Sequence, residues 1–281
     1  MNIAKLLPNI CWFWLLALIA AGPACATEAP LSVYFIDVGL GNATLLHQPG
    51  KCSMLIDAGP ANQGESLRTV LEKAGLKSLD YVVVTKLIPE NYFGLQIILG
   101  DVQIKELSDI GDDGRHSEVF KDYKQLQTEV PYSVVAAGDS WQCGDINIDV
   151  LSPSAESSNE SSSRAMALRA SYGNFKLLLM GDLTGAGERE LLKRKDNLKA
   201  TVIKLGHYGA ADSTSSALLE RAKPQLAVIS VNSRNDLNAP SESVLQRLSD
   251  SHIPVYRTDK DGTIHIRVNQ DGTLRLSRQK N

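Results

Sequence analysis

The chain has 281 residues, of which 43% are hydrophobic and 22% are charged, a profile typical of soluble globular proteins. Its formal net charge is -3. The composition therefore gives no support for non-specific nucleic-acid binding, which requires many lysines and arginines to displace counterions. It identifies no other partner.

Residues 1–26 are typical of a signal peptide. Lys5 is the only charged residue among them, Ile10 to Ala21 is an unbroken run of 12 apolar residues, and Ala24-Cys25-Ala26 fits the small-x-small cleavage rule. This run is shorter than the ~20 residues that a membrane-spanning helix needs, although an uncleaved anchor is the alternative. We expect cleavage, a mature domain over residues 27–281 with no membrane span, and a periplasmic or secreted location.

Strands and two helices are predicted between residues 31 and 151. Gln48-Pro49-Gly50-Lys51 is typical of a hairpin turn. Helical spacing of apolar residues indicates one helix that Gly75 ends, and another that Pro131 keeps from continuing. The predicted strands are Leu31 to Asp37, Ala43 to His47, Cys52 to Asp57, Tyr81 to Val84, Val102 to Leu107, Tyr132 to Ala136 and Ile146 to Leu151, and the helices contain Leu67, Val70, Leu71 and Ala74, and Val119, Phe120, Tyr123 and Leu126.

The central strand and its loop are the most informative stretch of this half. Tyr81 to Val84 is a four-residue apolar run, long enough for a buried strand and too short for a helix. A loop at the end of a central strand is a common place for an active site in α/β proteins. The loop from Thr85 to Gly94 contains no His, Cys or Asp, so it has the position of an active-site loop without the usual chemical groups. An ordinary connector is the alternative.

The second half begins with a serine-rich segment. Ser152 to Arg164 contains seven serines in 13 positions, which predicts a flexible loop that joins two halves of one core. Gly173-Asn174 is a typical hairpin turn, and two Asp-Gly turns, at Asp261-Gly262 and Asp271-Gly272, bracket the final predicted strands. The predicted strands are Ala167 to Tyr172, Phe175 to Met180, Thr201 to Leu205, Leu226 to Val231 and Val255 to Arg257, with helices over Gly185 to Arg194, up to Lys223, and over Ser241 to Ser251.

The cysteines predict one disulfide. Cys11 and Cys25 belong to the signal peptide, which leaves Cys52 and Cys143 in the mature chain. An even count in an oxidising compartment favours a disulfide between them. Their spacing fits no zinc motif.

Several short motifs carry a resemblance to a known family. They are Asp37-Val38-Gly39-Leu40-Gly41-Asn42, Leu55-Ile56-Asp57-Ala58-Gly59, Val84-Thr85, Gly181-Asp182-Leu183, Gly206-His207-Tyr208-Gly209, Tyr256-Arg257-Thr258-Asp259 and Asp261-Gly262-Thr263-Ile264. In this order they resemble the metallo-β-lactamase superfamily, and above all the metallo-hydrolase domain of ComEC-type competence proteins, from about Leu31 to Val268. The resemblance implies an α/β fold, a four-layer αβ/βα sandwich, with a metal site at the strand ends between its two halves.

The metal-ligand positions depart from the family pattern. Family members have Thr-His-x-His-x-Asp-His after the central strand, and these residues supply ligands to two zinc ions. The corresponding positions here are Lys86, Ile88, Glu90 and Asn91. Asn42 stands in place of an Asp, Tyr208 in place of a His, and Ala239 in place of a late His.

The glycines that shape the loops match the family, so the scaffold is retained where the ligands are not. Glycine serves tight turns and positive φ angles rather than chemistry. The matching glycines are Gly39, Gly41, Gly59, Gly94, Gly181, Gly206 and Gly209.

Few metal-ligand candidates remain. Catalytic zinc needs three protein ligands and an open position for water. Asp182 and His207 are the residual catalytic candidates, with Asp57 and Glu90 as weaker oxygen donors. Lys86 would oppose a dication by Coulomb repulsion. Two zinc ions cannot be bound by this set, and one metal bound through oxygens suits Mg²⁺ or Mn²⁺ better than zinc.

Each candidate also has a structural interpretation. Asp37 and Asp57 are of the type that hydrogen-bonds loop amides, and His207 suits a hydrogen-bonded structural histidine. Because the resemblance brings the loops after the central strand and after Met180 together, we favour an ion pair between Lys86 and Asp182 in place of metal. Outside the motifs, surface or packing roles are expected for His47, His116, His252 and His265.

Two functions follow from these residues. The first is an exported, catalytically degenerate member of the family that acts as a binding or accessory module without a cofactor. The second is an active phosphodiesterase or nuclease in which zinc or another divalent metal at a reduced site activates water. The selective loss of ligands favours the first, so the sequence favours a protein that is not an enzyme.

Overall fold

The computed structural model describes residues 29–111, 120–154 and 164–279. The predicted signal peptide, Val119, His116 and most of the serine-rich segment lie outside the described residues. None of the helices in the described ranges is long and apolar enough to cross a membrane.

Strands from residues 31–134 and the last hairpin of the chain form a mixed sheet of eight strands. β2 and β3 form the predicted hairpin, and β3, β5, β7 and β8 run parallel to one another. In spatial order the strands are β17 (Leu274–Gln279), β16 (Thr263–Val268), β1 (Leu31–Phe35), β2 (Ala43–Gln48), β3 (Cys52–Ala58), β5 (Tyr81–Val83), β7 (Leu107–Asp109) and β8 (Tyr132–Val134).

Strands from residues 140–257 form a sheet of seven strands, in which β12 to β15 are parallel. The predicted turn at Gly173-Asn174 joins β11 to β12, and Gly173 has φ of +52°. In spatial order the strands are β15 (Val255–Arg257), β14 (Leu226–Ile229), β13 (Val202–Lys204), β12 (Phe175–Leu179), β11 (Ala167–Tyr172), β10 (Ile146–Ser152) and β9 (Ser140–Cys143).

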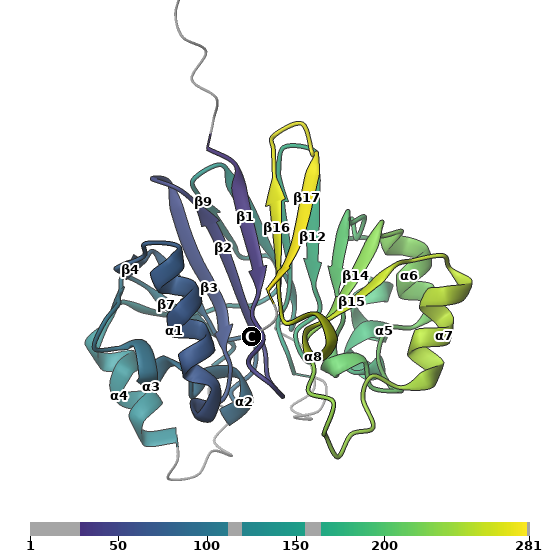
Figure 1. Cartoon of the computed structure of the whole chain (residues 1–281). Helices are drawn as coiled ribbons and strands as arrows, with labels where there is room; N and C mark the ends of the chain where they lie inside the picture. The colour runs from purple at the N-terminus through teal and green to yellow at the C-terminus, as the bar shows by residue number, and fades with distance from the viewer. Residues whose placement is uncertain (1–28, 112–119, 155–163, 280–281) are drawn as a thin grey trace, which may run out of the picture.

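Helices cover the outer faces of the two sheets, which confirms the four-layer αβ/βα sandwich (Figure 1). On the first sheet they are α1 (Gly64–Lys73), α2 (Pro89–Tyr92), α3 (Leu95–Ile98) and α4 (Lys121–Glu129), and on the second they are α5 (Gly185–Lys193), α6 (Ser216–Ala222) and α7 (Glu242–Asp250). The short α8 (Thr258–Asp261) connects β15 to β16, and single 3₁₀ turns occur at Ala61–Gln63 and His207–Gly209.

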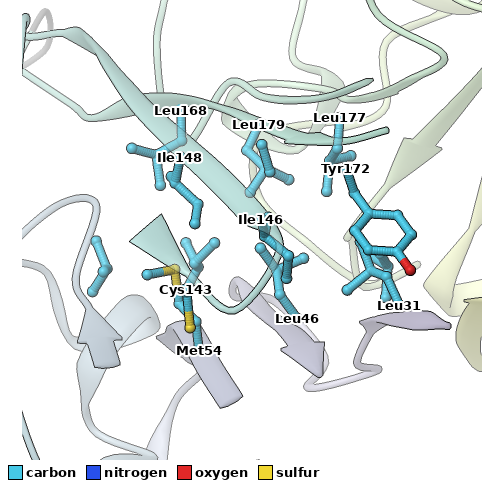
Figure 2. Close-up of a cluster of buried hydrophobic side chains, with 14 of the residues drawn as sticks. Leu31, Leu46, Met54, Cys143, Ile146, Ile148, Leu168, Tyr172, Leu177 and Leu179 are labelled. Carbon is cyan, nitrogen blue, oxygen red and sulfur yellow. The ribbon is translucent and has the colours of Figure 1, made fainter. Parts of the chain in front are cut away.

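An apolar core fills the space between the sheets. Figure 2 shows Leu46 and Met54 of the first sheet facing Ile146, Ile148 and other residues of the second. The predicted disulfide is confirmed, because the Cys52 and Cys143 sulfurs are bonded and the two Cα atoms lie 5.2 Å apart. This bond links β3 of one sheet to β9 of the other.

Some predicted elements differ from the structure. The single strand predicted from Val102 to Leu107 is wrong, since β6 (Gln103–Ile104) pairs only with β4 (Ser78–Leu79), and β7 begins afterwards in the main sheet. Lys105 donates to the Asp80 carboxylate at 2.7 Å where the chain passes between the two pairings. β9, α2, α3 and α8 were not predicted.

The fold brings the two halves together at one edge. β3 and β5 end there from the first sheet, and the parallel β12 and β13 end there from the second. Carboxyl ends of parallel strands are the usual location of a binding site in such sheets. The chain places its buried polar residues at this edge.

Candidate functional site

Six buried polar side chains meet where the strand ends of the two halves converge, and we call them the polar network. Each exposes 3% or less of its surface. The residues are Asn42, Asp57, Thr85, Asn91, Asp182 and Lys204.

The first part of the network joins the end of β3 to the end of β5. Asp57 accepts hydrogen bonds from the backbone N–H of Thr85 at 2.8 Å and from its hydroxyl at 2.7 Å. Asn91, on α2, donates to the Thr85 hydroxyl oxygen at 3.2 Å. The Asp57 carboxylate therefore binds a loop amide, which is the structural role that the sequence left open for it.

The second part connects the two halves of the chain through Asp182, directly after β12. The Asn42 side-chain amide donates to Asp182 Oδ1 at 2.9 Å, and the Asn91 amide donates to Oδ2 at 3.4 Å. The Asn42 amide also approaches Asn91 Oδ1 at 3.3 Å. Both oxygens of the carboxylate thus accept from neutral amides, of which Asn42 stands where the family has an Asp and Asn91 stands where it has a His.

Lys204, the last residue of β13, supplies the positive charge of the network. Its Nζ donates to Asn42 Oδ1 at 2.5 Å. The negative charges that act on this ammonium are those of Asp182 and Asp57. Asn42 therefore bridges Lys204 and Asp182, with its oxygen toward the ammonium and its nitrogen toward the carboxylate.

Burial controls the protonation of this network. It raises the pKa of Asp57 to about 8, against the lowering effect of the two bonds from Thr85. Burial also lowers the pKa of Lys204, while the Asp182 and Asp57 charges raise it. The Tyr208 hydroxyl next to this region has a pKa well above its usual range because it is buried and because Asp182 is near. A neutral Tyr208 phenol follows from the direction of its pKa shift, and the Lys204 ammonium and the Asp182 carboxylate attract each other across the bridging Asn42 side chain.

The predicted ion pair between Lys86 and Asp182 is wrong. No ion pair joins them within the described parts of the chain, and Lys86 is partly exposed. The loop turns into α2 directly after Lys86, so that Asn91 rather than Lys86 reaches the carboxylate. The positive charge comes instead from Lys204, in the second half.

The side chains of the remaining candidates are not part of the polar network. Glu90 is partly exposed, and its backbone oxygen accepts from the Asn42 N–H at 3.3 Å. His207 Nδ1 lies 3.0 Å from Asp212 Oδ1, a pairing that fits the structural interpretation of His207. Asp37 accepts from the Gly39 N–H at 3.3 Å, as expected for an Asp in a turn.

Sequence reasoning missed the role of Lys204. The predicted strand from Thr201 to Leu205 contains one lysine in an apolar run. A parallel strand with neighbours on both sides is buried on both faces, so a lysine within it requires a partner. That signal was available once β13 was placed between β12 and β14.

The donor set does not match a catalytic zinc site. Across the residues that the structure describes, no group of three or more His, Cys, Asp or Glu side chains is arranged to bind a metal ion. Asp182 is occupied by amide donors, and the buried Lys204 ammonium would repel a dication beside it. The residues at this site therefore do not fit a catalytic dication.

Replacing Asp57 by asparagine is expected to flatten the pH dependence of stability. The folded-state pKa of Asp57 is about 8 against an ordinary value of 3.8. Its contribution to stability is therefore complete below the lower value and is lost as the pH rises through the higher one. One proton corresponds to at most about 1.4 kcal/mol per pH unit. Urea denaturation at about pH 5, 7 and 8 measures the slope, and an unchanged slope in Asp57→Asn would contradict the assignment.

Sequence comparison finds curated relatives among competence proteins. The chain is 32% identical to ComE operon protein 3 of Bacillus subtilis over 276 residues, which cover 90% of this chain and 35% of that protein. It is 25% identical to competence protein ComA of Neisseria gonorrhoeae over 252 residues, covering 89% and 34%. The chain thus spans about a third of the length of the curated relatives it matches. No protein-family model matches it.

Solved structures share the fold at low sequence identity. The metallo-β-lactamase fold protein YhfI from Bacillus subtilis has a TM-score of 0.54 and 13% identity, covering 89% of this chain and 100% of that one. Zinc-bound PqqB from Methylobacterium extorquens has a TM-score of 0.53 and 13% identity, covering 80% and 87%. At these identities the likeness concerns the arrangement of the elements alone.

Proposed function

Because this chain is a metallo-β-lactamase-fold protein that resembles the ComEC-type competence proteins in sequence, we propose that it is a catalytically degenerate member of that group. In this proposal it acts as a binding or accessory module and hydrolyses nothing. It needs no zinc or other cofactor for folding. The competence roles belong to the named relatives, and this chain corresponds to about a third of their length.

The buried ammonium of Lys204 is the observation that carries the proposal. In a hydrolase of this fold, dications would provide the positive charge between the two halves. Here Lys204 provides it, through Asn42, and the Asp182 oxygens are already hydrogen-bonded. A cation fixed to the chain stabilises the carboxylate without activating water, so the network supports structure rather than hydrolysis.

We further propose that the protein is exported. Residues 1–26 would act as a cleaved signal peptide and residues 27–281 as the mature domain, located in the periplasm or outside the cell. The Cys52–Cys143 disulfide supports this location, because such bonds persist in oxidising compartments.

Metal content and activity together test the proposed function. We expect protein purified without chelator to contain far less than one equivalent of zinc, manganese or iron by elemental analysis. We also expect no turnover of a phosphodiester substrate when zinc, manganese or magnesium is added. The Lys86→His/Ile88→His variant, which restores two family ligands, should remain inactive because Lys204 is still present.

The opposite result would favour the active hydrolase. Near-stoichiometric metal, together with hydrolysis that Asp182→Ala or His207→Ala abolishes, would overturn the degenerate assignment. Asp250→Ala, on the surface of α7, is a matched control because it removes a carboxylate far along the chain from the network. Activity that persists in Asp182→Ala would indicate a contaminating enzyme and leave the degenerate assignment in place.

A further inference from the structure

The edges of the two main sheets differ in length. β8, β9 and β15 contain three, four and three residues. β17 contains six, and all six pair with β16 in one continuous register without a bulge. Natural proteins blunt sheet edges with short strands, bulges and charged residues, because a long regular edge is a template for another strand. β17 lacks the first two of these protections.

The backbone of β17 is available on one side. In an antiparallel sheet, alternate residues of an edge strand direct their N–H and C=O groups away from the neighbouring strand. Six residues are close to the usual strand length of about five or six. β17 can therefore accept a complete additional strand. In Figure 1 it lies beside β16, at the end of the sheet opposite helices α1, α3 and α4.

The inner side of β17 is incompletely covered. Leu274 and Leu276 pack against the core between the sheets but remain partly exposed. Side chains alternate between the two faces of a strand, so a strand added beside β17 would place every second residue next to these leucines. Apolar residues at those positions would extend the core.

The outer side of β17 is basic. Arg275 lies directly opposite Arg267 in the β16–β17 register, and both are exposed. Neither arginine forms an ion pair with any residue in the described ranges. Like charges directly opposite each other are unfavourable in a sheet. By contrast, Arg278 is paired with Asp261 at 3.1 Å.

We propose that β17 is a docking edge for an extended acidic segment of a partner protein, which adds a ninth strand to the first sheet. The segment would alternate acidic residues, on the face of Arg275, with apolar residues, next to Leu274 and Leu276. Main-chain hydrogen bonds would provide affinity and the alternation would provide specificity. A second copy of this chain is a poorer occupant, because pairing two β17 edges brings arginines together. This surface is distinct from the polar network, so the proposal goes beyond the proposed function.

A labelled peptide tests the proposal on the mature protein. The probe is a fluorescein-labelled peptide of about ten residues that alternates glutamate with valine, and fluorescence anisotropy at physiological salt measures its binding. We expect saturable binding that Arg275→Glu weakens by about tenfold or more. The same variant should gain affinity for the peptide that alternates lysine with valine. Arg275→Glu is expected to fold, since it replaces a like-charge pair with an Arg267–Glu pair.

Two controls separate strand addition from general charge attraction. Arg234→Glu reverses an exposed arginine in a loop and should leave the affinity unchanged. A glutamate–valine peptide that is N-methylated at alternate residues should not bind, because it cannot donate the main-chain hydrogen bonds. No binding by the parent peptide, equal binding by the N-methylated peptide, or an equal loss in Arg234→Glu would each overturn the proposal. Dimerisation that Arg275→Glu abolishes would also overturn it, in favour of a second copy.

Discussion

Replacing Lys204 by methionine is expected to lower the free energy of unfolding by about 3–5 kcal/mol. Methionine has a similar length and no charge, so the variant removes the ammonium with little change in packing. The Asp182 carboxylate would lose its buried positive neighbour, and Asn42 Oδ1 would lose its donor. Breaking one partner of a buried charge pair leaves an uncompensated charge, which is why the expected effect is large. Urea denaturation at neutral pH measures it.

The matched control is Lys86→Met. Lys86 lies on the neighbouring loop, is partly exposed and forms no ion pair within the described ranges, so we expect a change within about 0.5 kcal/mol. The double variant Lys204→Met/Asp182→Asn should recover part of the loss, because it removes both charges together. If Lys86→Met were the more destabilising variant, the ion pair favoured from the sequence would be correct and the network described here would be wrong.

Local turn chemistry explains why most of the fold could be predicted from the sequence. Gly75 has φ of +70° after α1, and Gly272 has φ of +87° between β16 and β17, so both positions favour glycine for the reason the sequence suggested. Gly94 is required for a different reason. A Cβ at this position would clash with the backbone oxygen of Ala58. Gly94, which is one of the glycines retained from the family pattern, therefore marks a true constraint of the backbone.

Some strand boundaries could not be predicted from the sequence, because they depend on pairing between distant segments. The residues from Val102 to Leu107 have the composition of one strand, and only their separate partners, β4 and β5, divide them into two. Likewise, β9 has the alternating burial of a strand but contains only four residues, and its pairing with β10 establishes it as a strand. Such choices depend on the assembled sheet rather than on local preference.

The partners within the polar network could not be predicted fully from the sequence either, because they come from distant parts of the chain. The sequence predicted a positive partner for Asp182, and the positive charge that acts on it in the structure is the Lys204 ammonium, through the Asn42 side chain. It assigned that partner to the wrong lysine, because Lys86 is close to the family motif while Lys204 lies in an apolar run. Two neutral amides, from Asn42 and Asn91, reach the carboxylate instead. Residues noted only as lost ligands thus supply the hydrogen bonds of the network.

Reducing the Cys52–Cys143 disulfide is expected to lower the free energy of unfolding by about 4–5 kcal/mol. The two cysteines are 91 positions apart, so the bond closes a long loop and removes much of the conformational freedom of the unfolded chain. It also links β3 in one sheet to β9 in the other, so the reduced protein keeps only packing between these strands. Urea denaturation with and without reductant measures the difference on one sequence.

The variant Cys52→Ala/Cys143→Ala provides the control for this experiment. It should unfold at a lower urea concentration than the oxidised protein, and reductant should not shift its midpoint further. Cys52 is at the start of β3 and Asp57 is near its end, so the polar network should be unaffected. We therefore expect Asp57→Asn to have the same effect on stability in the oxidised and reduced proteins, as independent sites do. An oxidised and a reduced protein with equal midpoints would show that the bond contributes no stability, and a strong coupling with Asp57→Asn would show that it supports the network.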